Sequence, residues 1–267
     1  MRALSVAGII FLVFITMHMI GPKRQSVNNY YCDEKIQIGD ITDEISKCLL
    51  DSENIVPITV NGKLGYKVGV VPTNYGSERV IKVIDLQNDY VDLELSFDLS
   101  FGEKFDFAQG GKLLGLSPQN ILSGGVTRGQ RTSKGWSVRA VFGKSGALGA
   151  YYYLPRDSST YGNFFFLKNV RLNVGDLYNV SLRVLVNSEK QGGKICLSAG
   201  KYTEDGLQLL GKDCKDNLIF SNDMHFPDNI SRLLFTYFHG GHSISYKPNS
   251  VSHLYFYNLS LVTRELK

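Results

Sequence analysis

Residues 136–155 read Trp-Ser-Val-Arg-Ala-Val-Phe-Gly-Lys-Ser-Gly-Ala-Leu-Gly-Ala-Tyr-Tyr-Tyr-Leu-Pro, and this stretch decides the fold that we predict. Two alternating runs flank the Gly-rich segment from Gly143 to Ala147. Alternating runs joined by a short segment that contains glycine are typical of a β-hairpin with a longer loop. The stretch therefore predicts two neighbouring antiparallel strands.

The register of this hairpin determines which side chains meet. If the hairpin folds about Ser145, Arg139 faces Tyr151 and Ser137 faces Tyr153. Residues two apart share a face of a strand, so these four groups project from one side. A slip of one residue would move them into the core, and the plain alternative is that they line the solvent face of an ordinary strand. The other face is apolar and predicts core: Val138, Ala140, Phe142, Leu148, Ala150, Tyr152 and Leu154.

The rest of the chain also shows the pattern of β-strands. Residues 64–71, 80–84, 90–99, 178–186, 233–238 and 254–262 alternate, and residues 163–172 are rich in aromatic side chains. We find no helical period longer than about three turns and no internal repeat. Many strands with one polar and one apolar face predict an all-β protein of two packed antiparallel sheets, a sandwich or jelly roll.

Composition limits the classes of protein that need to be considered. The chain has 267 residues, of which 43% are hydrophobic and 20% are charged, as in an ordinary globular protein. The net charge of +4 is too small to indicate a nucleic-acid partner, and no nucleic-acid-binding motif is present.

Residues 1–22 resemble a targeting segment. Arg2 precedes an apolar run from Ala3 to Ile20, as in a signal peptide. No pair of small residues suited to cleavage precedes Pro22, so an uncleaved signal anchor is the alternative. We expect a secreted, extracellular protein, or one whose extracytoplasmic domain is anchored by this segment, which is the one case in which it would contact a membrane.

Four cysteines fit an oxidising compartment. Three connectivities are possible, and local pairing of Cys32 with Cys48 and of Cys196 with Cys214 is the simplest. The first pair would tie down an N-terminal extension, residues 23–55. The remaining residues, 56–267, then form the β-domain.

Other sequence features bear on modification and ligands. Asn-x-Ser sequons at Asn179, Asn229 and Asn258 would permit N-glycosylation in a eukaryotic host. No Cys/His cluster has the spacing of a metal site, and we expect neither a metal nor a cofactor. We also expect a monomer.

Four motifs occur in an order that resembles a known family. They are residues 105–116 (Phe-Asp-Phe-Ala-Gln-Gly-Gly-Lys-Leu-Leu-Gly-Leu), Trp136-Ser-x-Arg, Tyr151-x-Tyr-x-Pro, and Phe-Thr-Tyr-Phe-His-Gly-Gly at 235–241 followed by residues 255–261. Over about residues 80–262 the chain resembles alginate-lyase-like and glucuronan-lyase-like polysaccharide lyases, which have a β-jelly-roll fold. It departs from them at Leu114, where the family usually has Pro, and at His239, where a second Phe is usual.

The resemblance implies which residues form the site. It places the catalytic groups Lys112, Arg139, Tyr151 and Tyr153 in a sugar-binding groove with the substrate-binding residue Ser137. Two further substrate-binding candidates are Gly111 and His239. The implied activity is cleavage of a uronic-acid-containing anionic polysaccharide by β-elimination. The rival hypotheses are a non-catalytic carbohydrate-binding or coat protein on the same fold, and an anchored adhesion domain.

The residue types suit this reaction. A lyase removes the proton next to a uronate carboxyl group and expels the glycosidic oxygen, and the resulting negative charge needs a cation nearby. Arg139 could bind a carboxylate with two parallel hydrogen bonds, while Lys112 would act as a point charge. A neighbouring cation lowers the pKa of a tyrosine from about 10, which makes Tyr151 or Tyr153 a candidate base, with the same or the other phenol as the acid.

Overall fold

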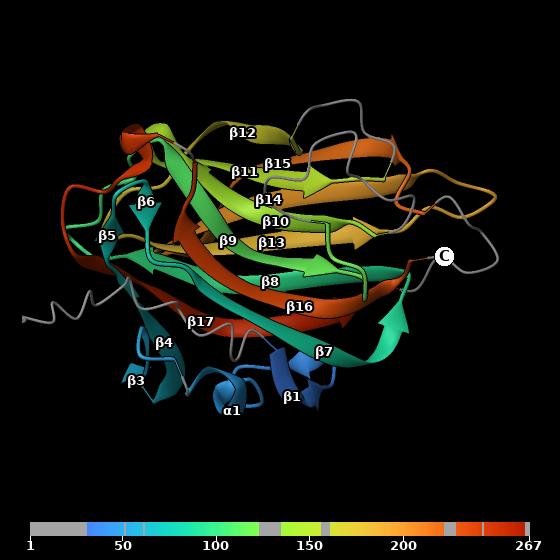
Figure 1. Cartoon of the computed structure of the whole chain (residues 1–267), viewed down its shortest axis with the longest axis horizontal. Helices are drawn as coiled ribbons and strands as arrows, with labels where there is room; N and C mark the ends of the chain where they lie inside the picture. Colours follow the sequence, from blue (N-terminus) through green and yellow to red (C-terminus); the bar gives the residue numbers. More distant parts are fainter. Residues whose placement is uncertain are drawn as a thin grey trace, which may run out of the picture.

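The structure, a computed structural model, describes residues 31–50, 52–60, 62–122, 135–155, 161–221, 228–241 and 243–264. The targeting segment predicted at residues 1–22 lies outside these ranges. Within them, no helix has the length and apolar character needed to span a lipid bilayer. The described residues form two large β-sheets that pack face to face (Figure 1).

The first sheet has seven strands. Its neighbours pair antiparallel, except that β1 runs parallel to β7. We predicted antiparallel sheets, and β1 differs because the chain crosses to the other sheet between β1 and β7, a connection long enough for parallel pairing. In spatial order the strands are β1 (Tyr31–Ile36), β7 (Val80–Tyr90), β16 (Ile230–His239), β9 (Gly110–Ser117), β10 (Ser137–Gly143), β11 (Ala147–Tyr153) and β12 (Asn163–Arg171).

The second sheet has eight strands and is antiparallel throughout. In order they are β15 (Gly206–Leu218), β14 (Gly193–Thr203), β13 (Leu177–Leu185), β8 (Asp92–Phe101), β17 (Ser252–Thr263), β4 (Lys63–Val70) and β3 (Ile55–Val60), with β2 (Gly39–Asp40) also on β17. The remaining elements are short: α1 (Ser46–Leu49), β5 (Pro72–Thr73), β6 (Gly76–Ser77), and the 3₁₀ turns η2 (Lys144–Gly146) and η3 (Ile244–Tyr246). Two packed sheets confirm the predicted jelly-roll class.

The core lies between the two sheets and is rich in aromatic rings. Phe235 of β16 packs edge-on against Phe256 of β17 at 5.3 Å between ring centroids, and against Tyr66 of β4 at 6.2 Å. All three side chains are fully buried. Edge-to-face pairs of this kind contribute beyond the area that they bury, so these rings hold the sheets together.

The hairpin has the predicted register. Arg139 pairs with Tyr151, and Ser137 pairs with Tyr153. The turn is possible because Ser145 and Gly146 adopt positive φ angles of 55° and 73°. The seven residues predicted to face the core, from Val138 to Leu154, are all buried there.

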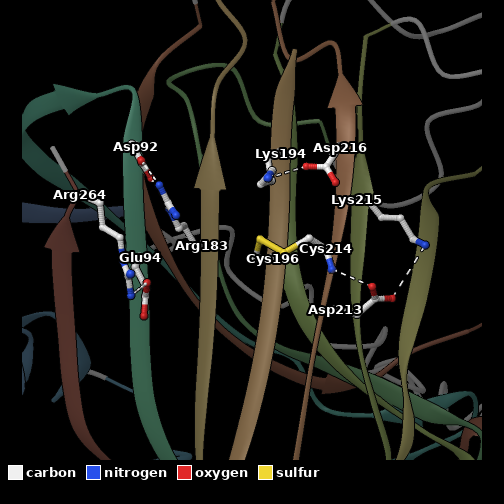
Figure 2. Close-up of a disulfide and its surroundings, with 10 residues drawn as sticks. All are labelled: Asp92, Glu94, Arg183, Lys194, Cys196, Asp213, Cys214, Lys215, Asp216 and Arg264. Carbon is white, nitrogen blue, oxygen red and sulfur yellow. Dashed lines mark hydrogen bonds and ion pairs between the residues drawn. A yellow bond between two sulfur atoms is a disulfide. The ribbon is translucent and has the colours of Figure 1, made fainter. Parts of the chain in front are cut away.

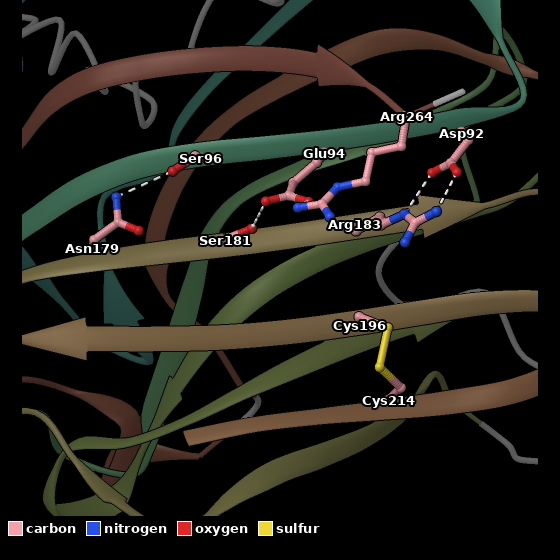
Figure 3. Close-up of polar contacts among 9 residues, drawn as sticks. All are labelled: Asp92, Glu94, Ser96, Asn179, Ser181, Arg183, Cys196, Cys214 and Arg264. Carbon is pink, nitrogen blue, oxygen red and sulfur yellow. Dashed lines mark hydrogen bonds and ion pairs between the residues drawn. A yellow bond between two sulfur atoms is a disulfide. The ribbon is translucent and has the colours of Figure 1, made fainter. Parts of the chain in front are cut away.

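The outer face of the eight-stranded sheet carries a network of polar contacts (Figure 3). Arg183 binds Asp92 through two nitrogens, and Glu94 accepts a hydrogen bond of 2.6 Å from Ser181 and pairs with Arg264 at 2.7 Å. Asp92 is only 5% exposed although it lies on the polar face. Bidentate pairing with Arg183 compensates for that burial.

Asp98 is the most enclosed carboxylate of this face, at 1% exposure. It accepts hydrogen bonds from the side-chain amides of Asn179, at 2.9 Å, and Asn258, and from the Tyr202 hydroxyl at 3.1 and 3.2 Å. Burial, together with the charge of Asp98, raises the pKa of Tyr202 to about 12, so this phenol stays a donor. Four strands are thereby joined at one side chain.

Two disulfides confirm the predicted local pairing, Cys32 with Cys48 and Cys196 with Cys214. Figure 2 shows the second one bridging β14 and β15, where the two cysteines lie directly opposite each other. An ion pair of 2.7 Å between Lys194 and Asp216 crosses the same two strands. The bridge thus fixes the edge strand of the eight-stranded sheet.

We predict that replacing Cys196 and Cys214 together by alanine lowers the free energy of unfolding by about 2–4 kcal/mol, because the unfolded chain regains freedom. Urea denaturation followed by circular dichroism measures this change. The matched pair Cys32→Ala with Cys48→Ala should cost a similar amount, since the two bridges close loops of 16 and 18 residues. An unchanged urea midpoint in the Cys196/Cys214 double variant would contradict the prediction.

Candidate active site

Three neighbouring strands of the seven-stranded sheet bring the predicted catalytic side chains together on its outer face. Arg139 of β10 lies between Gly115 of β9 and Tyr151 of β11, and Lys112 of β9 lies beside Val141 of β10. The register of β9 shifts between these two pairs, which adds one residue to β9. Lys112 and Gly115 therefore face the same side although they are three residues apart, as a bulge permits.

Arg139 is a buried cation with unused hydrogen-bonding capacity. Its side chain is 8% exposed, and Nη1 donates to Ser137 Oγ at 2.9 Å. Nε has no hydrogen-bond partner, and no acidic side chain in the described ranges pairs with the guanidinium. Burial lowers the pKa of Arg139 to about 10, although Tyr153 and Tyr151 act to raise it. The guanidinium remains charged at neutral pH.

Gly115 makes the position of Arg139 possible. A Cβ atom on Gly115 would lie 2.7 Å from Arg139 Cγ and 2.1 Å from the carbonyl oxygen of Val138. Any other residue would therefore displace the arginine stem and the strand beneath it. This glycine belongs to the motif quoted above, but its function could not be predicted without the pairing partner.

Lys112 is a second cation without an acidic partner among the residues that the structure describes. Its Nζ lies 3.0 Å from the centre of the Tyr151 ring, a close cation–π contact. Burial, and next the charge of Arg139, hold the pKa of Lys112 well below its usual value. An anion bound between Lys112 and Arg139 would offset the effect of the Arg139 charge and so raise the pKa of Lys112.

The two phenols of β11 form a pair. The Tyr151 hydroxyl donates to the Tyr153 hydroxyl at 3.3 Å, and the ring centroids are 5.2 Å apart. The amide of Gly162 donates to the Tyr151 oxygen at 3.0 Å. Tyr153 is buried at 4% exposure while Tyr151 is half-buried, so Tyr151 is the phenol nearer to solvent.

Ser137 belongs to this cluster but lies beneath it. The side chain is fully buried. Its hydroxyl donates to the carbonyl oxygen of Leu122 and accepts from Arg139. We expected Ser137 to bind the saccharide, and its surroundings instead assign it to holding the guanidinium.

His239 and Gly111 lie on the inner face of the sheet, away from the cluster. His239 is 2% exposed; its Nε2 donates to the carbonyl oxygen of Asp106 at 2.7 Å, and its Nδ1 accepts from the Tyr237 hydroxyl at 2.9 Å. Burial lowers the pKa of His239 to about 4. A Cβ on Gly111 would lie 2.5 Å from the buried Phe142 ring. Neither residue is placed to touch a saccharide on the outer face.

The asparagines of the three sequons are half-buried, and Asn179 and Asn258 lie on the other sheet. The amide nitrogens of Asn179 and Asn258 both donate to Asp98. The side-chain oxygen of Asn229 is buried without a hydrogen-bond partner.

Sequence reasoning missed two aromatic side chains on the same outer face. Phe164 and Phe166 of β12 pair with Tyr151 and Gly149 of β11. The aromatic-rich run at 163–172 is visible in the sequence, but its position at the edge of this sheet is not. In the ranges that the structure covers, no group of His, Cys, Asp and Glu side chains is arranged to hold a metal ion.

Comparisons with known proteins agree with this fold. Residues 73–259 match the family model described as Polysaccharide lyase 14. The marine PL-14 alginate lyase from Aplysia kurodai is 20% identical with a TM-score of 0.64, over 79% of this chain and 88% of that one. Alginate lyase vAL-1 from Chlorella virus is 18% identical with a TM-score of 0.62, over 79% and 89%. These similarities show a shared fold, and no curated protein matches the chain.

We predict that His239 makes stability depend on pH. The unfolded chain protonates this imidazole below its ordinary pKa of 6.5, whereas the folded chain keeps it neutral down to about 4. The contribution of His239 to the free energy of unfolding is therefore complete above pH 6.5 and is lost as the pH falls from 6.5 to about 4. The loss between pH 7 and pH 5 is about 2 kcal/mol.

Urea unfolding at the two pH values tests this, with His239→Gln as the variant that cannot titrate. The wild type should lose more stability on acidification than the variant does. Equal losses in the two proteins would show that other groups carry the pH dependence.

Proposed function

The chain belongs to the polysaccharide lyase 14 family, and from this membership we propose that it cleaves a uronic-acid-containing polysaccharide of the alginate or glucuronan type by β-elimination. The observation that carries the choice of an anionic substrate is the pair of cations, Arg139 and Lys112. Neither has an acidic partner among the described residues, and Arg139 Nε lacks any acceptor. A carboxylate from the ligand would supply the acidic partner for both side chains and the acceptor for Arg139 Nε.

Binding of the uronate carboxylate is the first step of the proposed mechanism. Nε of Arg139 is free to donate, while Nη1 is held by Ser137. When the proton next to the carboxyl group leaves, negative charge spreads onto the carboxylate. Arg139 and Lys112 then stabilise that charge at a site where little rearrangement is needed, because Ser137 and Gly115 fix the guanidinium in advance.

In this proposal Tyr151 transfers the proton and Tyr153 positions Tyr151. Tyr151, the more accessible phenol, acts as phenolate and takes the proton from the carbon beside the carboxyl group. The electron pair forms the new carbon–carbon double bond as the bond to the glycosidic oxygen breaks. Tyr151 returns the proton to that oxygen. In this proposal Tyr153, whose oxygen lies 3.3 Å from that of Tyr151, donates to the Tyr151 phenolate and holds it in place. The atoms balance without a metal or cofactor.

We also propose that the protein acts outside the cytosol. Two disulfides support this location, since such bridges persist in oxidising compartments. A polymeric substrate would also be encountered there. The rival hypothesis, a binding protein that no longer turns over substrate, predicts the same cation pair but no unsaturated product.

One assay separates these two hypotheses. The protein is incubated with alginate, glucuronan and a neutral glucan, and the ultraviolet absorbance of the unsaturated uronate product is followed. We expect product from a polyuronate and none from the glucan. Binding of polyuronate with no absorbance change would favour the non-catalytic protein.

We predict that Tyr151→Phe lowers kcat about 10²–10⁴-fold, the usual worth of general acid–base catalysis, without changing the unfolding temperature. Tyr153→Phe should lower kcat less, because this buried phenol acts through Tyr151. Tyr75→Phe, at an exposed position outside the cluster, is the control and should behave like wild type. Near-wild-type kcat in both β11 variants would refute the assignment.

We predict that Arg139→Ala lowers kcat/KM about 10²–10³-fold, as loss of a transition-state donor does, and that Arg139→Lys retains more activity because the charge survives. Steady-state kinetics on the preferred polyuronate measures both. Arg264→Ala, which removes a half-exposed arginine from the other sheet, is the matched control. If the alanine and lysine variants are equally impaired, charge is not what Arg139 contributes.

A further inference from the structure

Two phenylalanines are unusually exposed beside the candidate active site. Phe164 and Phe166 of the edge strand β12 are 61% and 39% exposed, and they contact each other at 5.6 Å between ring centroids. Apolar side chains on an edge strand favour aggregation, and an exposed apolar patch usually marks a binding surface. We therefore expect a ligand to bind over these two side chains.

The backbone beneath Phe166 is built so that its ring lies flat on the sheet. A Cβ on Gly149 of β11 would lie 2.6 Å from Phe166 Cδ1, and one on Gly143 of β10 would lie 2.9 Å from Cε1. The ring thus covers two glycines on two different strands. One ring face rests on backbone, and the partial exposure of the side chain belongs to the other face.

The two rings continue the row of catalytic side chains. Phe164 pairs with Tyr151 across β11 and β12, and the two rings are parallel within 3° at a centroid distance of 6.5 Å. Phe166 lies one pair further along, in line with Gly149, Val141 and Lys112. Successive pairs on one face are roughly 7 Å apart along a strand. A polymer whose carboxylate sits at Arg139 and Lys112 would reach these rings with its next units.

We propose that Phe166, flanked by Phe164, is a stacking platform that binds a pyranose ring of the substrate one unit beyond the two that flank the cleaved linkage. This inference rests on the proposed function and adds to it a subsite and a dependence on chain length. The negative face of an aromatic ring attracts the polarised C–H groups of a sugar ring, while the charged carboxylates remain with the cations. The occupant is a further unit of the same anionic chain.

The test compares the KM of wild type and Phe166→Ala on polyuronate oligosaccharides of increasing length. We expect KM to rise about 2- to 10-fold on long chains, the worth of one stacking contact, with kcat nearly unchanged and the shortest cleavable oligosaccharide unaffected. Phe166→Tyr should restore wild-type KM. Leu209→Ala removes a side chain that is 67% exposed on the other sheet, and serves as control.

A second variant guards against a folding defect. Gly143→Ala keeps Phe166 but forces its ring to tilt, because the clashing atoms are the far end of that side chain and the Gly143 φ of −113° suits alanine. It should raise KM on long chains as Phe166→Ala does. Equal KM values at every length in both variants, or an equal rise in Leu209→Ala, would overturn the platform.

The result can be separated from failure of the proposed function. If wild type forms no unsaturated product, calorimetric titration of wild type and Phe166→Ala with the same oligosaccharides replaces the kinetics. Weaker binding of long chains to the variant supports the platform in a protein without turnover. Identical affinities reject it.

Discussion

Two basic side chains, Arg139 and Lys112, lie in one partly buried site without an acidic partner among the described residues, and the residues around them hold them in place. Burying unpaired charges costs several kcal/mol per ion. Gly115 leaves space for the Arg139 side chain, Ser137 accepts a hydrogen bond from the guanidinium while donating to the Leu122 carbonyl, and the Lys112 ammonium lies against the Tyr151 ring. Such a site is less stable empty than with an anion bound, and this is the physical reason for proposing an acidic sugar as its ligand.

Much of the fold could be predicted from the alternation of apolar and polar residues along the strands. Arg139, Tyr151 and the buried residues between them alternate so regularly that only one hairpin register buries the apolar set. The same alternation identified β8, β13 and β17, because each presents one face to the core. Local pairing of the cysteines was the simplest of three possible connectivities, and it is confirmed. Cys196 and Cys214 lie opposite each other on neighbouring strands, whereas Cys32 of β1 is bonded to Cys48 of α1.

The remainder depended on contacts that no local pattern encodes. Parallel pairing of β1 depends on where the chain returns after crossing the other sheet. The bulge in β9 turns both Leu113 and Leu114 inward and so brings Lys112 beside Arg139. His239 was a substrate-binding candidate because of its motif, but it alternates with the core residues Phe235 and Tyr237 and is buried on the inner face. Ser137 was assigned to the correct face, and only its depth was unpredictable.

The Asp98 network has a practical consequence for making the protein. An oligosaccharide attached to Asn179 or Asn258 would replace one of the two N–H groups of the amide that donates to Asp98, and so weaken the contacts of this enclosed carboxylate. Expression in a host with an N-linked glycan transferase would then yield a mixture of sound and weakened molecules. A bacterial host gives a homogeneous preparation with the amides intact. Removing the sequon serines Ser181 and Ser260 has the same result, whereas an Asn→Asp exchange would remove the amide.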